Sequence, residues 1–130
     1  MSHQLYAAIL LYTSNAIYSQ LNQHLRSENR SAVRKYFKYL RMLFEAMDTL
    51  PQNKVTLWRG VSVDLYEQYK VDSEITWWGV SSCTSDESVA RGFAQGCGGN
   101  CSLLIIETQT ACDISCITFY SHEKESLLAP

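Results

Sequence analysis

Two glutamates, Glu123 and Glu125, stand one residue apart near the end of the sequence, directly before the apolar pair Leu127-Leu128. In an extended chain alternate side chains share a face, so both carboxylates would point the same way, with backbone positions roughly 6.5 Å apart. Such a pair can divide two roles around a positive charge that develops during a reaction. A solvated edge strand, whose charges discourage edge-to-edge pairing, is the simpler interpretation of this stretch alone.

Two further polar features follow predicted strands earlier in the chain. Arg59 ends the β-prone run Val55-Thr56-Leu57-Trp58, and the run Ser81-Ser82-Cys83-Thr84-Ser85 precedes a predicted helix. Taken singly, an arginine at a strand end is typical of a surface ion pair, and a serine run before a helix is typical of a cap. The ordered combination of arginine, hydroxyl run and glutamate pair is much less common by chance, so it changes the interpretation of each.

Length and composition are typical of one globular domain. The 130 residues can bury a hydrophobic core without disulfides or metal, and 46% apolar with 18% charged residues excludes a disordered chain. The formal net charge of −2 indicates no general attraction to nucleic acid, so we expect no nucleic-acid partner. A basic cluster with helical spacing favours a solvated helix face over a phosphate-binding patch; it comprises Arg30, Arg34, Lys35, Lys38 and Arg41.

The sequence contains no membrane or export signal that we can identify. No stretch reaches the roughly 18 continuous apolar residues of a membrane span, and the first residues lack a signal-peptide pattern. We therefore expect no membrane span. Cytoplasmic and secreted locations both stay open, because the chain can be a piece of a longer protein.

Four of the five cysteines form two C-x3-C pairs, Cys97 with Cys101 and Cys112 with Cys116, while Cys83 stands alone. Zinc sites permit this spacing, but it is not distinctive. Zinc, a disulfide and free buried thiols all fit the pattern, and the odd count favours free thiols. We expect no metal and assign no catalytic role to the three histidines, which are His3, His24 and His122.

The first fifty residues have helical periodicity. Apolar residues recur with a helix period from Leu5 to Arg26, which predicts one helix with a wide apolar stripe. A polar run ends this pattern, and Ser31 is a suitable N-cap for a second helix that stops before Pro51. The apolar positions of that helix, which predict core packing, are Val33, Phe37, Leu40, Phe44 and Met47.

After Pro51 the pattern changes to short β-prone runs separated by turns. We expect strands over 55–58, 73–80, 102–107 and 117–120, helices over 63–69 and from Asp86, and a loop over 96–100. No linker divides the chain. The sequence therefore predicts a single α+β domain over residues 1–130, in which a helical part (1–50) packs on one side of a mixed β core of short strands (51–130).

The three strand-end motifs together resemble those of the arginine-type mono-ADP-ribosyltransferases, a family built on an arginine, a Ser-x-Ser/Thr and a Glu-x-Glu motif. Leu57-Trp58-Arg59-Gly60-Val61 is similar to the family's aromatic-Arg-Gly strand, and the run from Val80 to Ser85 is similar to its Ser-Thr-Ser strand, with Ser82 as first serine and Thr84 as last. The stretch from Glu123 to Pro130 resembles its Glu-x-Glu motif. Ala90 and Phe93 fit the following helix, and the leading helices resemble those of animal ecto-type enzymes, so the resemblance covers nearly the whole chain and implies an ADP-ribosyltransferase-like fold.

Two departures from the family pattern are visible. Cys83 takes the middle of the serine motif, where threonine is common, and we expect its side chain to point off the ligand face. The family normally continues into at least one further strand beyond the glutamates. We therefore expect either a fragment or a sheet that lacks its last strand.

The resemblance implies NAD or NADP as co-substrate and, as partner, a target protein with an exposed arginine, to which ADP-ribose passes while nicotinamide leaves. It implies that the Arg59 guanidinium binds the pyrophosphate bidentately and that Gly60 lets the backbone hold the nicotinamide amide. Ser82 would hydrogen-bond Glu125 or the nicotinamide ribose. Phe93 would contact the cofactor, and Trp77 and Trp78 are further stacking candidates, although core packing is favoured for all three aromatics.

In the same reading, the two glutamates have separate roles. Glu125 would stabilise the oxocarbenium-like ribose and grip its 2'-hydroxyl. Glu123 would orient and deprotonate the acceptor guanidinium, which is a poor nucleophile while protonated.

Three alternatives stay open. An NAD glycohydrolase, with water as acceptor, would keep Glu125 and depend little on Glu123. An inactive domain that binds a partner or a nucleotide would not need intact Arg59, Ser82 and Glu125. A zinc module built on the paired cysteines would require stoichiometric zinc.

Overall fold

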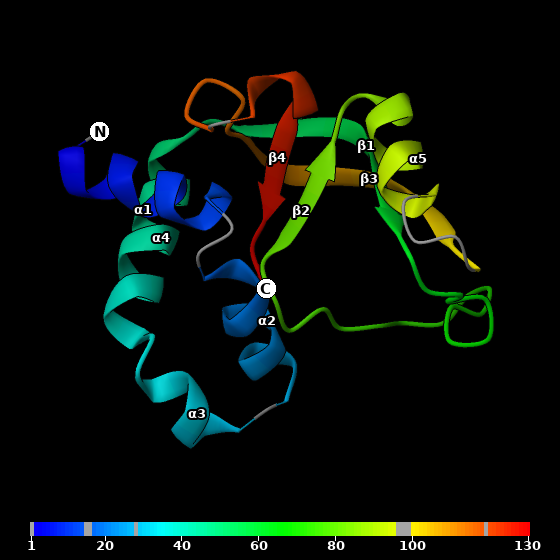
Figure 1. Cartoon of the computed structure of the whole chain (residues 1–130), viewed down its shortest axis with the longest axis horizontal. Helices are drawn as coiled ribbons and strands as arrows, with labels where there is room; N and C mark the ends of the chain where they lie inside the picture. The colour runs from blue at the N-terminus through cyan, green and yellow to red at the C-terminus, as the bar shows by residue number, and fades with distance from the viewer. Residues whose placement is uncertain (1, 15–16, 28, 96–99, 119) are drawn as a thin grey trace.

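In the part of the chain that the structure describes, N-terminal helices combine with a four-stranded β unit (Figure 1). A computed structural model of the chain describes residues 2–14, 17–27, 29–95, 100–118 and 120–130. The elements, in chain order, are α1 (His3–Thr13), α2 (Tyr18–Arg26), α3 (Arg30–Arg34), α4 (Phe37–Thr49), β1 (Gln52–Val61), β2 (Ser81–Thr84), α5 (Glu87–Gln95), β3 (Ser102–Asp113), the 3-10 turn η1 (Ser121–Glu123) and β4 (Glu125–Leu128).

Among the described residues, four helices and not two make up the N-terminal part. The stretch predicted as one helix divides after Thr13, where the Ser14 hydroxyl donates to the Leu11 carbonyl at 2.7 Å. The predicted second helix also divides, into α3 and α4, and its N-cap is Asn29, whose side chain accepts from the Ala32 amide. The prediction was wrong because an apolar stripe can continue across a break, so periodicity alone does not locate helix ends.

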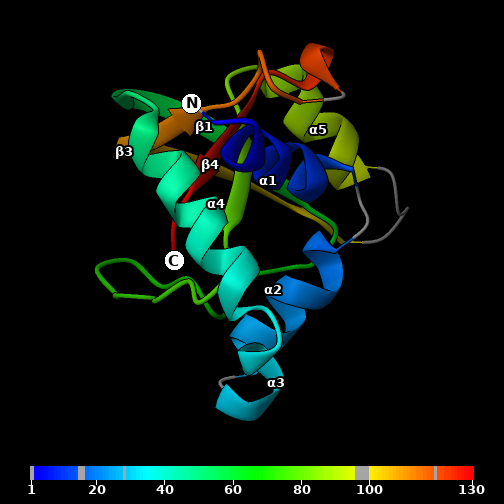
Figure 2. The same cartoon turned by 90° about the vertical axis from the view of Figure 1, so that its left-hand side faces the viewer.

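Helices α1 and α4 lie side by side and cover one face of the β unit (Figure 2). The main core joins these helices to the strands through side chains that are fully buried: Ile9, Leu43, Ile114 and Leu127. The Tyr39 hydroxyl adds a hydrogen bond from α4 to the Ala8 carbonyl of α1 at 2.8 Å. Burial of this shared apolar surface fixes the helices against the strands that carry the predicted motifs.

The described strands close in the order β1-β2-β4-β3, and every pair is antiparallel. The predicted α+β class is confirmed, but the strand pairing is not mixed. β1 and β3 pair along most of their length, for example Leu57 with Ile106. α5 packs against β1 at the end of the β unit away from α1 and α4, so the helices do not all lie on one side (Figure 1).

The strands predicted around 55–58 and 102–107 exist and are longer than predicted, as β1 and β3. The helix predicted over 63–69 and the strand predicted over 73–80 are wrong, and so is the strand predicted over 117–120 for its described residues, since Phe119 lies outside them. Residues 62–80 contain turns but no helix or strand. Ile117 lies in a turn, and its amide donates to the Ile114 carbonyl. The predicted loop over 96–100 lies almost entirely outside the described residues.

Apolar composition misled these predictions because several apolar side chains in the irregular segment are exposed. Val63 and Tyr66 of the predicted helix and Ile75 of the predicted strand are exposed, so their apolar side chains add nothing to a core. The helix predicted from Asp86 is confirmed as α5, and the Asp86 side chain accepts from the Ser88 amide ahead of its first turn. None of the described helices combines the length and apolarity that a membrane crossing requires.

Candidate active site

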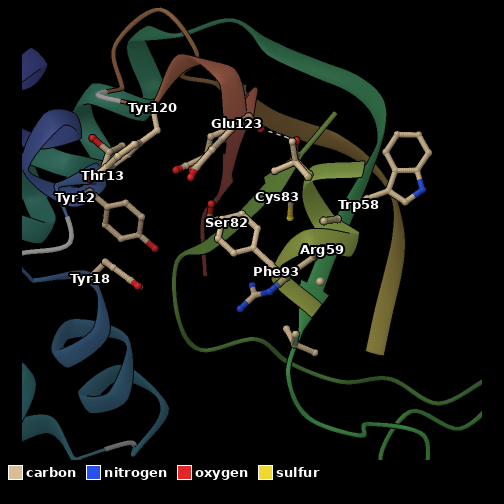
Figure 3. A pocket seen from close by; sticks show the side chains of 16 residues that line it. Tyr12, Thr13, Tyr18, Trp58, Arg59, Ser82, Cys83, Phe93, Tyr120 and Glu123 are labelled. Carbon is tan, nitrogen blue, oxygen red and sulfur yellow. Dashed lines mark hydrogen bonds between the residues drawn. The ribbon is translucent and has the colours of Figure 1, made fainter. Parts of the chain in front are cut away.

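A cleft of about 420 Å³ lies among β1, β2, β4, α1 and α5 (Figure 3). Its walls include all six residues that the sequence predicted for the site, namely Arg59, Gly60, Ser82, Phe93, Glu123 and Glu125. These residues come from five different elements. The fold therefore assembles the three motifs into one place.

The sheet register brings the motifs together. Trp58 on β1 pairs with Thr84 on β2, and Thr84 pairs with Glu125 on β4. This row across three strands places Arg59 and Glu125 close to the hydroxyl run of β2. Figure 3 shows the Trp58 ring turned away from the other side chains of the cleft.

The glutamate pair does not lie on one extended strand, so the alternation expected for an extended chain does not apply here. Glu123 ends η1, Lys124 has a left-handed backbone with φ 47°, and Glu125 begins β4. A non-glycine residue at positive φ needs support from its surroundings. Here the Thr84 hydroxyl donates to the Glu123 carbonyl at 2.6 Å, and the Ser85 amide donates to the Lys124 carbonyl at 3.3 Å. The turn keeps both carboxylates at the same cleft.

Glu125 is a buried carboxyl group, and one of its oxygens has no hydrogen-bond partner among the described residues. The residue is 8% exposed, and the oxygen in question is Oε2. Burial raises the pKa of Glu125 to about 7, a side-chain hydrogen bond with Ser82 acts in the opposite direction, and the charge of Glu123 adds to the rise. Such a group is poised to stabilise a positive charge that enters the cleft.

Tyr12 of α1 lines the same cleft as Glu125 and is tied to the start of β2. Its hydroxyl donates to the Val80 carbonyl at 3.0 Å and accepts from the Asn22 side chain at 3.0 Å, while the Val80 amide donates to Asn22 Oδ1 at 2.8 Å. Burial raises the pKa of Tyr12 to about 12, with the Asn22 hydrogen bond opposing and the Glu125 charge contributing to the rise. The phenol therefore stays protonated at neutral pH.

Cys83 lines the cleft but offers no thiolate. It is buried with Leu57 and Ala111 in a second small core, and this burial raises its pKa to about 11, while Arg59 acts in the opposite direction. A thiol with a raised pKa is a weak nucleophile at neutral pH. The Cys83 side chain thus belongs both to the core and to the cleft wall. We had expected it to point away from the ligand face.

Arg59 borders this cleft and a second cavity of about 360 Å³. Trp77 and Trp78 line the second cavity and not the first, and the Arg59 Cζ atom lies 5.5 Å from the centre of the Trp77 ring. Trp78 is half exposed, and Phe93 is exposed at the cleft. The expected core packing is therefore wrong for these two aromatic side chains.

Sequence reasoning missed the tyrosines of the cleft wall. Tyr12, Tyr18 and Tyr120 line the cleft, whereas the helix period placed Tyr12 in an apolar stripe and gave no role to the others. The one available signal was a hydroxyl-bearing aromatic in an otherwise aliphatic stripe. His122 is exposed and stacks edge-on with Tyr120 at 6.3 Å between ring centres.

The described cysteines do not form a common site. Cys83 and Cys112 are buried free thiols, Cys101 and Cys116 are exposed free thiols, and Cys97 lies outside the described residues. Over the part of the chain that the structure describes, no group of three or more His, Cys, Asp or Glu side chains is placed to hold a metal ion.

The whole chain, residues 1–130, matches the family model described as NAD:arginine ADP-ribosyltransferase. This protein belongs to that family, and the resemblance inferred from the three motifs is confirmed. No curated protein sequence matches the chain.

Solved structures of ADP-ribosyltransferases share the fold. The eukaryotic mono-ADP-ribosyltransferase ART2.2 aligns with a TM-score of 0.80 at 19% identity, over 98% of this chain and 56% of its own. The Vis toxin from Vibrio splendidus aligns with a TM-score of 0.74 at 21% identity, over 99% and 63%. Exoenzyme S from Pseudomonas aeruginosa aligns with a TM-score of 0.72 at 24% identity, over 98% and 62%. The chain thus spans less than two thirds of each of these structures.

Proposed function

We propose that this protein cleaves the bond between nicotinamide and ribose in NAD and transfers the ADP-ribose to an arginine side chain of a target protein. The observation that carries the proposal is the convergence of Arg59, Ser82, Glu123 and Glu125 on one cleft. Family membership supports NAD as co-substrate. Structural relatives have been solved with carba-NAD, in the case of exoenzyme S, and with agmatine, in the case of Vis.

Arg59 and the α5 side of the cleft hold the dinucleotide in this proposal. A guanidinium presents N–H donors in a planar fork that matches two phosphate oxygens, which suits Arg59 to the pyrophosphate. Gly60 offers backbone groups to the nicotinamide amide, and the exposed ring of Phe93 on the same wall offers an aromatic contact.

Glu125 stabilises the ribose as the bond to nicotinamide breaks. Nicotinamide leaves as a neutral pyridine, so no general acid is required, and the positive charge passes to an oxocarbenium-like ribose. The buried Glu125 carboxylate, steadied by Ser82, lies in a low-dielectric wall where its attraction for that cation is strong. The cationic nicotinamide ring of NAD also favours the ionised form of Glu125, because an opposite charge lowers a carboxyl pKa.

Glu123 receives the acceptor. It is less buried than Glu125 and lies on the turn ahead of β4, at the same cleft, where a side chain from another protein can reach it. A carboxylate at that point orients an incoming guanidinium through charge-assisted hydrogen bonds and accepts its proton as the new bond to ribose forms.

The test is nicotinamide release from NAD by the purified protein, with and without agmatine as an arginine mimic. The variants are Glu125→Gln, Glu123→Gln and, as a matched control, Glu107→Gln, whose carboxylate is exposed on β3 and outside the cleft. We expect Glu125→Gln to lower release by roughly 100-fold or more, in the range for loss of one transition-state contact. Glu107→Gln should match the wild type.

The acceptor decides between transfer and hydrolysis. If agmatine accelerates release and Glu123→Gln removes only that acceleration, arginine transfer is supported. Release that is indifferent to agmatine and to Glu123 would replace the proposal with NAD glycohydrolysis. A folded wild type that releases no nicotinamide would overturn both.

A further inference from the structure

Arg59 is held by an aromatic ring and not by a carboxylate. Among the described residues, ion pairs join Lys70 to Glu67 and Arg91 to Glu87, and neither includes Arg59. The contact that the structure gives to its guanidinium is the face of Trp77, with Cζ 5.5 Å from the ring centre. This distance lies within the range of a cation–π interaction, for which tryptophan is the strongest partner.

Trp77 is itself fixed within the irregular segment 62–80. Its Nε1 donates to the Tyr69 hydroxyl at 2.8 Å, which sets the orientation of the indole plane. The segment is attached to β3 through Ser102, whose hydroxyl accepts from the Leu65 amide at 2.9 Å and donates to the Val63 carbonyl at 2.7 Å. At its other end, the Val80 amide donates to Asn22. The segment that carries the indole is therefore tied to the fold near both of its ends.

We propose that Trp77 is a positioning residue, which holds the Arg59 guanidinium in place for the pyrophosphate while leaving its N–H donors free. The inference rests on the function proposed above. A carboxylate partner would occupy the same donor fork and compete with phosphate oxygens, because both bind it bidentately. The Trp77 ring, which lies under the guanidinium carbon, attracts the cation through its π electrons and supplies no oxygen acceptor, so it does not occupy the donor fork as a carboxylate would. The Arg59 side chain loses less conformational freedom when the dinucleotide binds, because the Trp77 ring has already restricted it.

The test measures NAD affinity by calorimetry and kcat and KM by nicotinamide release. We expect Trp77→Leu to raise both the Kd and the KM for NAD by roughly twofold to thirtyfold, the factor that a cation–π contact of about 0.5–2 kcal/mol gives. kcat should change less than twofold, because the contact orients a binding group and not the reacting atoms. Trp77→Phe keeps an aromatic face and should restore most of the affinity.

The matched control is Tyr66→Leu, which removes a cation–π pair of the same kind in the same segment. Lys70 Nζ lies 5.1 Å from the Tyr66 ring centre, and Tyr66 is 77% exposed, so this pair has no contact with the cleft. Its loss should leave the Kd for NAD unchanged. If Trp77→Leu does not fold, Tyr69→Phe carries the test, since it removes only the hydroxyl that orients the indole; a rise in Kd of about twofold is then expected.

Each outcome has a separate meaning. An unchanged Kd in folded Trp77→Leu, or equal losses in Trp77→Leu and Trp77→Phe, overturns the positioning role while the proposed function stands. A fall in kcat at constant Kd also overturns it. A wild type that neither binds NAD nor releases nicotinamide overturns this inference together with the proposed function.

Discussion

The Thr84 side chain fastens the Glu123 backbone to the end of β2. Its hydroxyl donates to the Glu123 carbonyl at 2.6 Å and accepts from the Asp86 amide at 3.0 Å. One buried hydroxyl thus connects the serine motif, the glutamate turn and the start of α5. Since Lys124 has a left-handed backbone, this bond helps to hold the turn that presents Glu123.

We expect Thr84→Val, which keeps the side-chain shape, to destabilise the protein by about 1–3 kcal/mol, because the part-buried Glu123 carbonyl and Asp86 amide lose their partner. The turn should loosen, so agmatine-dependent nicotinamide release should fall more than agmatine-independent release. Thr84→Ser keeps the hydroxyl and should retain the wild-type ratio. A Thr84→Val protein with an unchanged ratio would show that the hydrogen bond does not position Glu123.

Glu125 should make the stability of the protein fall as pH rises. Its pKa is raised from 4.5 to about 7 on folding, so between these values the folded state binds the proton more strongly than the unfolded state. The stabilising contribution is therefore complete below about pH 4.5 and is lost as pH rises through about 7, at a cost on the order of 3 kcal/mol.

Glu125→Gln removes this titration. Urea unfolding should show the variant more stable than the wild type at about pH 8 and similar to it at about pH 4, since glutamine resembles the protonated acid. The difference in unfolding free energy between the two proteins separates the contribution of Glu125 from those of the other carboxylates. A variant that is less stable than the wild type at the higher pH would contradict the buried, uncompensated charge.

The chemical motifs were predictable because each one is local. An arginine after a β-prone run, a hydroxyl run before a helix and a Glu-x-Glu before an apolar pair are visible without knowledge of the fold, and all of them reach the cleft. Their turn geometry was not predictable in the same way. The left-handed Lys124 depends on Thr84, which is distant in sequence, so the local pattern suggested a continuous strand.

Features that depend on distant partners were missed. The lengths of β1 and β3 follow from their pairing with each other, which no local propensity encodes. The segment 62–80 has β-prone and helix-like runs but packs on the fold through single contacts such as Trp77 on Arg59. Trp77 was a candidate for ligand stacking in the sequence, and its neighbour in the structure is an arginine.

Gly60 is required by the packing of α5 on β1. A Cβ atom at this position would lie 1.8 Å from the Ala90 carbonyl oxygen and 3.0 Å from the Ala94 amide, and both are helix backbone atoms that cannot turn aside. We expect Gly60→Ala to cost about 1–3 kcal/mol or more and to weaken NAD binding, because α5 carries Phe93 and must shift. Chemical denaturation and calorimetry measure the two effects.

Gly92 of α5 is the matched control for Gly60, since a Cβ atom at position 92 meets nothing within 4 Å. Gly92→Ala should raise stability by about 0.5–1 kcal/mol, the usual gain from replacing a helical glycine. Equal stability of the two alanine variants would refute the close contact between β1 and α5.

The bonds among Tyr12, Asn22 and Val80 should be energetically coupled. Each polar atom in this group is buried and paired with another, so the removal of one side chain leaves its partners without hydrogen bonds. We expect Asn22→Leu to cost about 2–4 kcal/mol and Tyr12→Phe about 1–2 kcal/mol. The double variant should cost less than the sum, because the bond between the two side chains is lost only once.

Gln23→Leu is the control for Asn22, since it replaces the adjacent amide on α2, which is exposed, and it should change stability by less than about 0.5 kcal/mol. Urea unfolding of the wild type, the two single variants and the double variant completes the cycle. Strict additivity would mean that Tyr12 and Asn22 act independently. Coupling of about 1 kcal/mol would instead show that α1 and α2 together fix the start of β2, and with it the position from which Ser82 reaches Glu125.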